Sequence, residues 1–261
     1  MMDPLKNNRW LAYRRARPGA KVRLFCFHYA GGAASVFRTW QDSLPGFVEV
    51  CPVQLPGRES RLREPLLVAV EPLLDALVEN LGPAFDRPFA FFGHSMGAIL
   101  SFELSLRLRR SGLQGPEALM VSGRRSPHSP ETDRPIHDLP GEEFHHELRK
   151  LNGTPEEVLA HPELMELLEP VLRADFAVCE TYTHRPTEPL ACPLTVFGGI
   201  EDPKTPRDVL EGWRRYTASD FLLERFPGDH FFLNGASRPQ VLRAVGEEMA
   251  RVIRRLEEAV V

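Results

Sequence analysis

The sequence lacks a long apolar run: no stretch of its 261 residues approaches the roughly 20 apolar residues that a membrane-spanning helix needs. It also lacks a tract of one charge, because 32 basic and 36 acidic residues are spread along the chain, which argues against a nucleic-acid partner. Residues 1–17 are polar and arginine-rich and hold no apolar core of about 7–15 residues, unlike a secretory signal. We therefore expect a cytoplasmic protein that does not act at a membrane.

Cysteine is scarce, and its spacing does not indicate a metal site. The four cysteines, Cys26, Cys51, Cys179 and Cys192, stand far apart in apolar surroundings. Zinc sites and disulfide frameworks usually show close pairs or a dense cysteine pattern. The sequence therefore predicts four buried thiols in a reducing compartment, with no metal or cofactor site.

Internal repeats and low-complexity linkers are also absent, and strand-like and helix-like segments alternate instead. Such alternation is typical of an α/β fold with a mainly parallel sheet flanked by helices. A chain of this length can form one domain, which we expect to span residues 1–261. The predicted strands cover 22–27, 47–53, 89–92, 118–122, 193–197 and 221–226, and a helix is predicted over 66–81.

The most informative segment is an apolar strand that runs through Gly93-His94-Ser95-Met96-Gly97 into an apolar helix. In this Gly-x-Ser-x-Gly pattern a serine at a sharp strand-to-helix turn projects its hydroxyl above the sheet, while the two glycines keep the turn uncrowded. We predict that Ser95 is a nucleophile. An ordinary turn with a capping serine is the alternative.

A nucleophilic serine needs a histidine base and an acid that orients the base. Asp202 follows a predicted buried strand, and His230 follows the next one, so Ser95, Asp202 and His230 keep the order found in α/β hydrolases. Glu201 is the alternative acid. Asp229 adjoins the histidine in sequence and is poorly placed to reach its ring.

The remaining residues near the predicted strand ends have supporting roles. We expect the backbone N–H groups of Met96 and Ala30 to form the oxyanion hole, with Gly31 as the second candidate on the early loop. His28 and His94 are expected to pack or line the pocket rather than act as base. Arg58 could meet an anionic substrate group, but a solvated surface arginine is the favoured interpretation.

About 70 residues separate two neighbouring predicted strands, too many for a simple crossover. This segment, residues 124–190, is called the lid here, and helices are expected near 144–151, 155–159 and 162–182. We predict that the lid covers the serine and forms an apolar chamber. A helical subdomain without a role in the site is the alternative. Its histidines are expected to be surface or lid residues: His128, His137, His145, His146 and His161.

Taken together, these motifs resemble the type II thioesterases of polyketide and nonribosomal peptide synthesis, a family of the α/β-hydrolase fold. The resemblance rests on residues 25–32, 53–58, 93–97, 152–155, 162–165, 172–176, 198–202 and 228–232. His28 stands where the family usually has proline, and Asn152 where it commonly has glycine.

The resemblance implies a serine thioesterase that hydrolyses acyl groups from the phosphopantetheine thiol of an acyl or peptidyl carrier protein, clearing stalled or misprimed synthases. A monomer is expected. A chain-releasing thioesterase or a small-molecule carboxylesterase is the alternative enzyme, and a catalytically silent partner of carrier proteins is the alternative of another class.

Overall fold

The structure, a computed structural model, describes residues 5–130 and 133–259 and contains one six-stranded parallel sheet with the order β2-β1-β3-β4-β5-β6. Residues 1–4, 131–132 and 260–261, which belong to the predicted domain and its lid, lie outside the described residues. The strands are β1 Val22–Phe27, β2 Val48–Pro52, β3 Phe89–His94, β4 Leu119–Ser122, β5 Leu194–Gly199 and β6 Phe221–Phe226.

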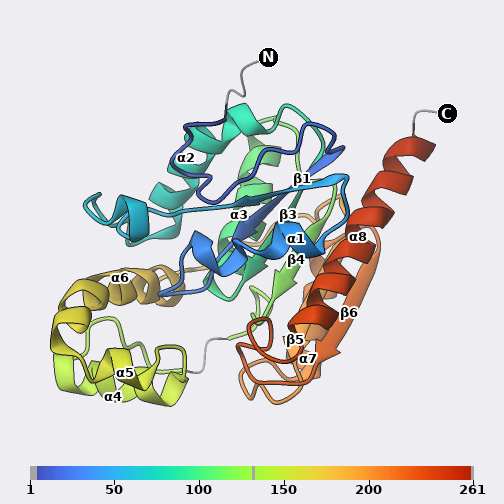
Figure 1. The fold of residues 1–261 in the computed structure, drawn as a ribbon. Coiled ribbons are helices and arrows are strands. Elements are labelled where there is room, and N and C mark those ends of the chain that lie inside the picture. Colours follow the sequence, from blue (N-terminus) through green and yellow to red (C-terminus); the bar gives the residue numbers. More distant parts are fainter. Residues whose placement is uncertain (1–4, 131–132, 260–261) are drawn as a thin grey trace.

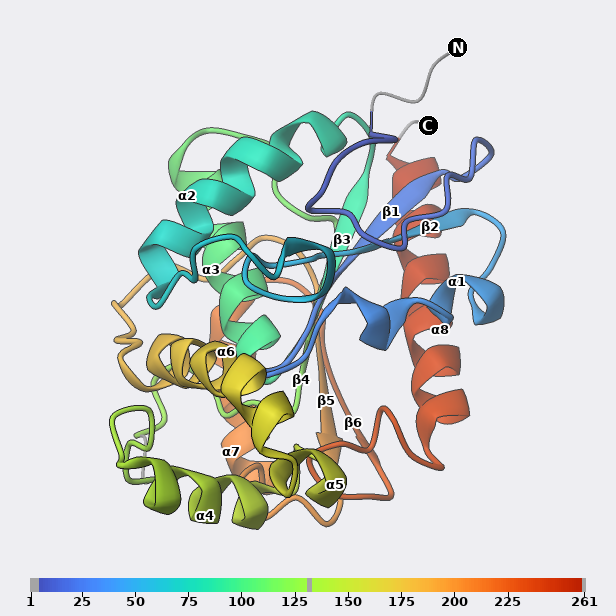
Figure 2. The ribbon, with the colours of Figure 1, turned by 60° about the vertical axis from the view of Figure 1, so that its left-hand side comes forward.

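Helices connect the strands and cover both faces of the sheet. They are α1 Trp40–Ser43, α2 Val70–Leu81, α3 Met96–Arg110, α4 Gly141–Leu151, α5 Glu156–Leu159, α6 Pro162–Glu180, α7 Arg207–Glu211 and α8 Arg238–Glu258, with short 3-10 turns at Ala34–Phe37, Glu59–Arg61, Gly82–Ala84 and Gly212–Tyr216. Figure 1 shows the sheet between two helical layers, α2 and α3 on one face and α1 and α8 on the other. Figure 2 shows the same layers from another side. The fold is that of the α/β hydrolases, as predicted.

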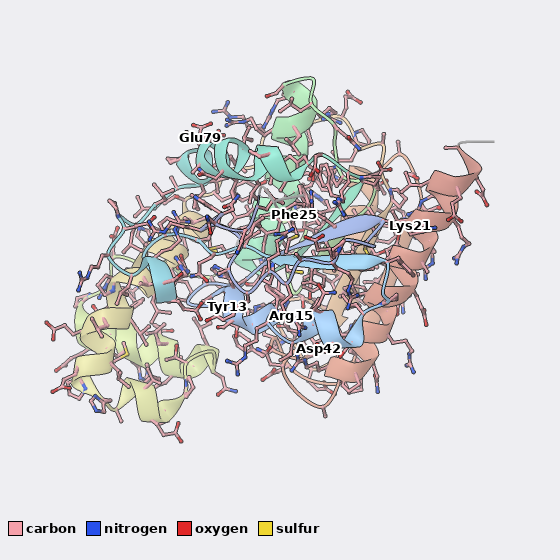
Figure 3. The ribbon with its side chains drawn as sticks, turned by 45° about the horizontal axis from the view of Figure 1, so that its top comes forward. Tyr13, Arg15, Lys21, Phe25, Asp42 and Glu79 are labelled. Carbon is pink, nitrogen blue, oxygen red and sulfur yellow. The ribbon has the colours of Figure 1, made fainter. Side chains whose placement is uncertain are left out.

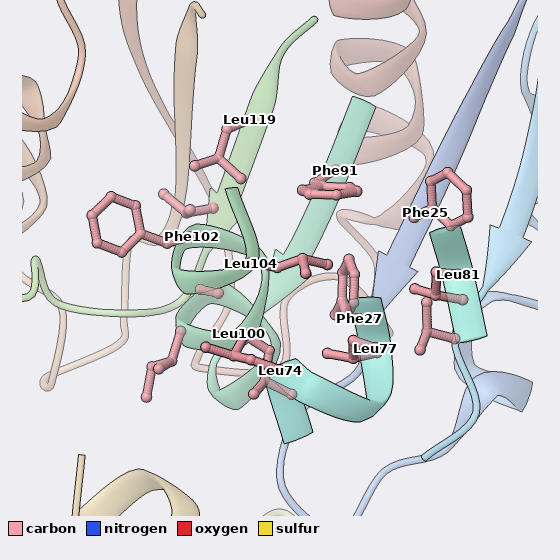
Figure 4. Packing of buried hydrophobic residues seen from close by; sticks show 14 of the residues in the cluster. Phe25, Phe27, Leu74, Leu77, Leu81, Phe91, Leu100, Phe102, Leu104 and Leu119 are labelled. Carbon is pink, nitrogen blue, oxygen red and sulfur yellow. The ribbon is translucent and has the colours of Figure 1, made fainter. Parts of the chain in front are cut away.

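The core between the sheet and the α2–α3 layer is built from aromatic strand residues and helix leucines. Phe25 and Phe91 pack edge to face with ring centroids 6.0 Å apart, and Leu77 and Leu104 fill the space beside them (Figure 4). Each fully buried side chain of this kind contributes about 1.5–3 kcal/mol. Charged side chains such as Lys21 extend outward instead (Figure 3).

Most predicted elements form within a few residues of the predicted bounds, but α2 begins at Val70 instead of residue 66. Leu66 is used in the preceding loop, where its side chain lies against Gly57, a residue with φ +81°. The apolar pattern of this stretch therefore belongs partly to a loop that packs on a turn.

The lid contains α4, α5 and α6 and is inserted between β4 and β5. The lid buries a small cluster of its own, separate from the two clusters that flank the sheet: Ile136, Phe144, Leu148, Leu159, Met165 and Leu172. In Figure 1 α4 and α5 lie away from the sheet, below α6. Within the described residues, no helix is both long and apolar enough to cross a membrane.

The prediction of four buried thiols is only half correct. Cys26 and Cys51 lie inside strands and are buried, whereas Cys179 and Cys192 are partly exposed. Cys179 lies on α6 on the side that faces a cavity, so its apolar surroundings in sequence reflect a pocket lining and not a closed core.

Candidate active site

All the predicted catalytic groups follow the carboxyl ends of parallel strands. The chain passes from β1 to β2 on one side and then to β3 on the other, so the loops after β1 and β3 diverge around a crevice. Ligands bind at such a point in open α/β sheets. Ser95 follows β3, residues 28–32 follow β1, Asp202 follows β5 and His230 follows β6.

Ser95 occupies a strained turn between β3 and α3. Its φ of 55° and ψ of −110° lie outside the common regions for a residue with a side chain. A Cβ on Gly93 would lie 2.0 Å from the Gly97 carbonyl oxygen, and one on Gly97 would lie 2.1 Å from that of Phe27. Both glycines are therefore required sterically, and the turn has the geometry of a nucleophile elbow.

Asp202 and His230 are joined directly. The His230 Nδ1–H donates to Asp202 Oδ2 over 2.8 Å, and the same carboxylate accepts from the Thr205 hydroxyl at 2.9 Å and the Lys204 N–H at 2.9 Å. Burial alone would raise the pKa of Asp202, but these hydrogen bonds, that of His230 first, hold the pKa below its ordinary value. Asp202 is thus a carboxylate that fixes the ring with its proton on Nδ1.

The alternative acids have other partners. The exposed Glu201 carboxylate accepts the Gly228 N–H, which braces the loop before His230. Asp229 accepts the Phe231 N–H at 2.8 Å. The structure brings Asp202, and not Glu201, to the ring of His230.

The loop after β1 is held by a set of hydrogen bonds around Tyr29. The Tyr29 carbonyl accepts from the Gly32 N–H at 2.9 Å and from the His28 ring Nδ1 at 2.8 Å. Burial and the nearby charge of Arg58 lower the pKa of His28 to about 4, so the ring is neutral at pH 7. The His28 ring thereby restrains the turn after β1.

The interpretation of Arg58 as a solvated surface residue is wrong. Its side chain is 8% exposed and forms a bidentate ion pair with Asp175 of α6, at 2.6 and 2.8 Å. It also donates to the Gly32 carbonyl at 3.1 Å, and the Gly31 N–H donates to the same Asp175 carboxylate at 2.8 Å. Arg58 thus links the lid helix to the early loop.

Asp175 is the residue that sequence reasoning missed, although a signal was present. It lies among Val171, Leu172, Ala174 and Val178 on the buried side of α6. A carboxylate on such an apolar face requires a cationic partner or several donors. Asp175 lies within a helix and not after a strand, where the acids of the site were expected.

His94 packs behind the site, as expected. It is fully buried, its Nδ1 lies 2.8 Å from the Ser122 hydroxyl, and its ring centroid lies 5.1 Å from that of His230. Burial lowers the pKa of His94 well below its ordinary value, so a neutral ring supports the wall of the site. A Cβ on Gly123 would lie 2.5 Å from this ring, which explains the glycine after β4.

A cavity of about 680 Å³ joins the predicted catalytic residues to the lid, and Ser95, Asp202 and His230 all line it. Its apolar lining comes mainly from the lid, namely Ile136, Leu148, Leu151, Leu172 and Phe176, and its charged lining includes Arg124, Arg125, Arg134, Lys150 and Lys204. A second cavity of about 510 Å³ lies beside α2 and α3 and contains none of the predicted catalytic residues.

The lid histidines lie on the surface or in contacts within the lid. His137 and His145 are half-buried and pair with Glu180 and Glu169. Within residues 5–130 and 133–259, no three histidine, cysteine or acidic side chains are grouped so as to hold a metal ion.

The fold and this geometry define an α/β hydrolase with a serine elbow. A family model described as thioesterase domain matches residues 22–249. The chain is 43% identical to RedJ, a thioesterase from the prodiginine biosynthetic pathway in Streptomyces coelicolor, with a TM-score of 0.83 over 89% of this chain and 88% of RedJ. It is 37% identical to the type II thioesterase BorB from the borrelidin cluster, with a TM-score of 0.81 over 90% of this chain and 95% of BorB.

A relative named linear gramicidin dehydrogenase LgrE, from Brevibacillus parabrevis, is 46% identical over 87% of this chain and 88% of its own length. The present sequence has the serine elbow and lacks the Gly-x-Gly-x-x-Gly fingerprint of dinucleotide-binding proteins. Its motifs therefore match a thioesterase and not the dehydrogenase activity in that relative's name.

The chain belongs to the thioesterase domain family and is a thioester hydrolase. The resemblance to the type II thioesterases of polyketide and nonribosomal peptide pathways is confirmed.

Proposed function

We propose that Ser95, His230 and Asp202 form the catalytic triad of a thioesterase that removes acyl groups from the phosphopantetheine thiol of acyl or peptidyl carrier proteins. The observation that carries the proposal is the hydrogen bond from His230 to Asp202, at 2.8 Å, in a cavity that Ser95 also lines. Acyl transfer to a serine requires a histidine that a carboxylate orients beside the serine hydroxyl, so the shared cavity and the oriented ring support the proposal.

The chemistry follows from the position of the proton on His230. Because Nδ1 donates to Asp202, Nε2 is free to accept the Ser95 proton as the hydroxyl attacks the thioester carbonyl. Collapse of the tetrahedral intermediate breaks the C–S bond and expels the thiolate, which takes the proton from His230 and leaves as the thiol. A water activated by the same nitrogen then hydrolyses the acyl-serine and releases the acid.

The N–H groups of Met96 and Ala30 are the proposed oxyanion donors. Met96 is the first residue of α3, where an N–H has no acceptor within the helix. On the early loop, Asp175 takes the Gly31 N–H, which favours Ala30 over Gly31 as the second donor. Ala30 lines the same cavity as Ser95.

The shape and lining of the cavity suit an acyl chain on a long polar arm. The apolar lid side chains can hold the acyl group, and the charged residues of the lining can lie along the arm. By analogy with RedJ and BorB, the biological role is the removal of stalled or misprimed acyl groups from a synthase. We expect the protein to work in the cytoplasm, as a monomer.

Hydrolysis of a panel of acyl carrier proteins that differ only in the acyl group tests the substrate class. We expect acyl-carrier thioesters to be cleaved at far higher kcat/KM than p-nitrophenyl esters of the same acids. Equal rates on both would favour a small-molecule carboxylesterase.

Trapping with a fluorophosphonate tests the nucleophile and excludes the silent binding partner. Mass analysis should find one adduct on the chain, at Ser95. A folded protein that neither reacts with the probe nor turns over thioester would contradict the proposed chemistry.

A further inference from the structure

The buried carboxylate of Asp175 lies at the junction of lid and body. It is 2% exposed and accepts three hydrogen bonds, two from Arg58 and one from the Gly31 N–H. Asp175 belongs to α6, in the lid, whereas its partners belong to the loops after β1 and β2. The contact therefore joins the lid to two loops of the body.

Hydrogen bonds fix the backbone of the early loop on both sides of Ala30. The Tyr29 carbonyl is held by Gly32 and His28, the Gly31 N–H by Asp175, and the Gly32 carbonyl by Arg58. Among the hydrogen bonds of the described residues, none uses the Ala30 N–H. The loop therefore presents one backbone donor to the cavity and engages the groups on both sides of it.

Packing from α6 reinforces the same restraint. Gly31 has a φ of +75°, and the Leu172 side chain lies 2.5 Å from where a Cβ on Gly31 would be. Leu172 and Asp175 are three residues apart and so lie on one face of the helix. One face of α6 thus supplies both an apolar contact and a charged acceptor to the loop.

We infer that Asp175 is a positioning residue for catalysis: through Gly31 and Arg58 it holds the Ala30 N–H in the direction that the oxyanion needs. The inference rests on the proposed function, since it assumes Ala30 as a donor. Oxyanion stabilisation depends on donors that are fixed before the reaction, because reorienting these donors during the reaction would cost part of the stabilisation free energy. A lid residue thereby controls the chemical step without touching the substrate.

A purely structural ion pair would make different predictions. A buried pair that only stabilises the fold changes the amount of folded enzyme and its melting temperature when it is broken. A pair that orients the donor changes how tightly the folded enzyme binds the transition state relative to the ground state. These two quantities can be measured separately.

The test compares wild type with Asp175→Asn. The amide must turn an N–H2 donor toward Arg58 or Gly31, so at least one hydrogen bond is lost. We expect kcat per titrated active site to fall about 10–100-fold with little change in KM, as for a misplacement of about 1 Å in a catalytic group. The Ki of an acyl trifluoromethyl ketone, which forms a tetrahedral oxyanion on the serine, should rise by the same factor.

Glu169→Gln is the matched control, because it breaks ion pairs of the same helix with Arg173 and His145 but does not touch the early loop. We expect it to leave both kcat and the ketone Ki unchanged. If Asp175→Asn does not fold, Arg58→Lys takes its place, since one ammonium group cannot reproduce the bidentate contact.

Folded Asp175→Asn or Arg58→Lys with unchanged kcat and unchanged ketone Ki would overturn the inference. So would a loss of kcat while the ketone still binds as to wild type. Ser95→Ala is assayed in parallel: if it retains activity, the proposed function itself fails, and if only the Asp175 result is negative, the failure concerns the positioning role alone.

Discussion

The body and the lid hold their parts of the site by different means. On the body, Ser95 sits in a turn where glycines at 93 and 97 leave no steric freedom, and Asp202 is buried with three hydrogen-bond donors. On the lid, Phe176 and its neighbours belong to a small cluster bordered by half-exposed ion pairs such as that of His145 with Glu169. We therefore propose that the body holds the reacting groups rigidly and that the lid selects the acyl chain.

One part of the lid does not fit this division. The second half of α6, which carries Leu172 and Asp175, is fixed to the early loop, whereas α4 and α5 contact mainly other lid residues. Pro170 lies inside α6 and removes one hydrogen bond of the helix near the boundary. We therefore expect any opening of the lid to move α4, α5 and the first half of α6.

Replacing the nucleophile should produce the largest effect. In Ser95→Ala we expect kcat to fall by on the order of 10⁴-fold or more, because triad members act as a unit. The fold should persist, since the glycines and hydrogen bonds of the turn remain. Near-normal turnover by a folded variant, measured with an acyl carrier thioester, would show that Ser95 is not the nucleophile.

The two neighbouring acids after β5 should differ by nearly as much. Asp202→Asn should lower kcat by about 10⁴-fold, because the amide no longer favours the His230 tautomer with its proton on Nδ1. Glu201→Gln is the matched control: its side-chain oxygen can still accept the Gly228 N–H, so little loss is expected. The opposite ranking in steady-state kinetics would assign the acid to Glu201.

The sequence was most informative where the local backbone geometry allows only one residue type. The elbow at Ser95, the strand ends at Asp202 and His230 and the alternation of elements all depend on short-range patterns, and the structure brings the three residues into one cavity. Arg58 and Asp175, in contrast, are 117 residues apart and meet only through the packing of the lid. No local pattern distinguishes a buried arginine from an exposed one until its partner is known.

A change in the lid should alter selectivity and leave the nucleophile intact. Phe176 lines the cavity and packs edge to face on Phe144, with centroids 6.1 Å apart. In Phe176→Ala the chamber gains space, so we expect the ratio of kcat/KM for long over short acyl chains to rise about 10–100-fold, at roughly 1–3 kcal/mol per methylene that fits. Acyl carrier proteins of graded chain length provide the measurement.

Leu167→Ala is the control for that variant, because Leu167 lies on the same helix but is 54% exposed. It should leave the preference unchanged, and both variants should react with a small fluorophosphonate at the wild-type rate. A fixed chain-length preference across folded lid variants would show that selection does not reside in the lid.

The smallest expected effect concerns the stability of the body near the early loop. Burial, followed by the charge of Arg58, lowers the pKa of His28 to about 4 in the folded protein, against about 6.5 in the unfolded chain. Since the unfolded state then binds the extra proton first, the stabilising contribution is complete above about pH 6.5 and is lost as the pH falls toward 4.

In His28→Asn the Nδ2–H can still donate to the Tyr29 carbonyl, but the side chain no longer titrates. We expect the free energy of unfolding, measured in urea at pH 7, 6 and 5, to depend less steeply on pH by about 1.4 kcal/mol per unit between pH 6 and 5. The buried His94 keeps part of the slope in both proteins. An identical slope in wild type and variant would mean that the pKa of His28 is the same in the folded and unfolded states, which would contradict a ring that burial keeps neutral in the early loop.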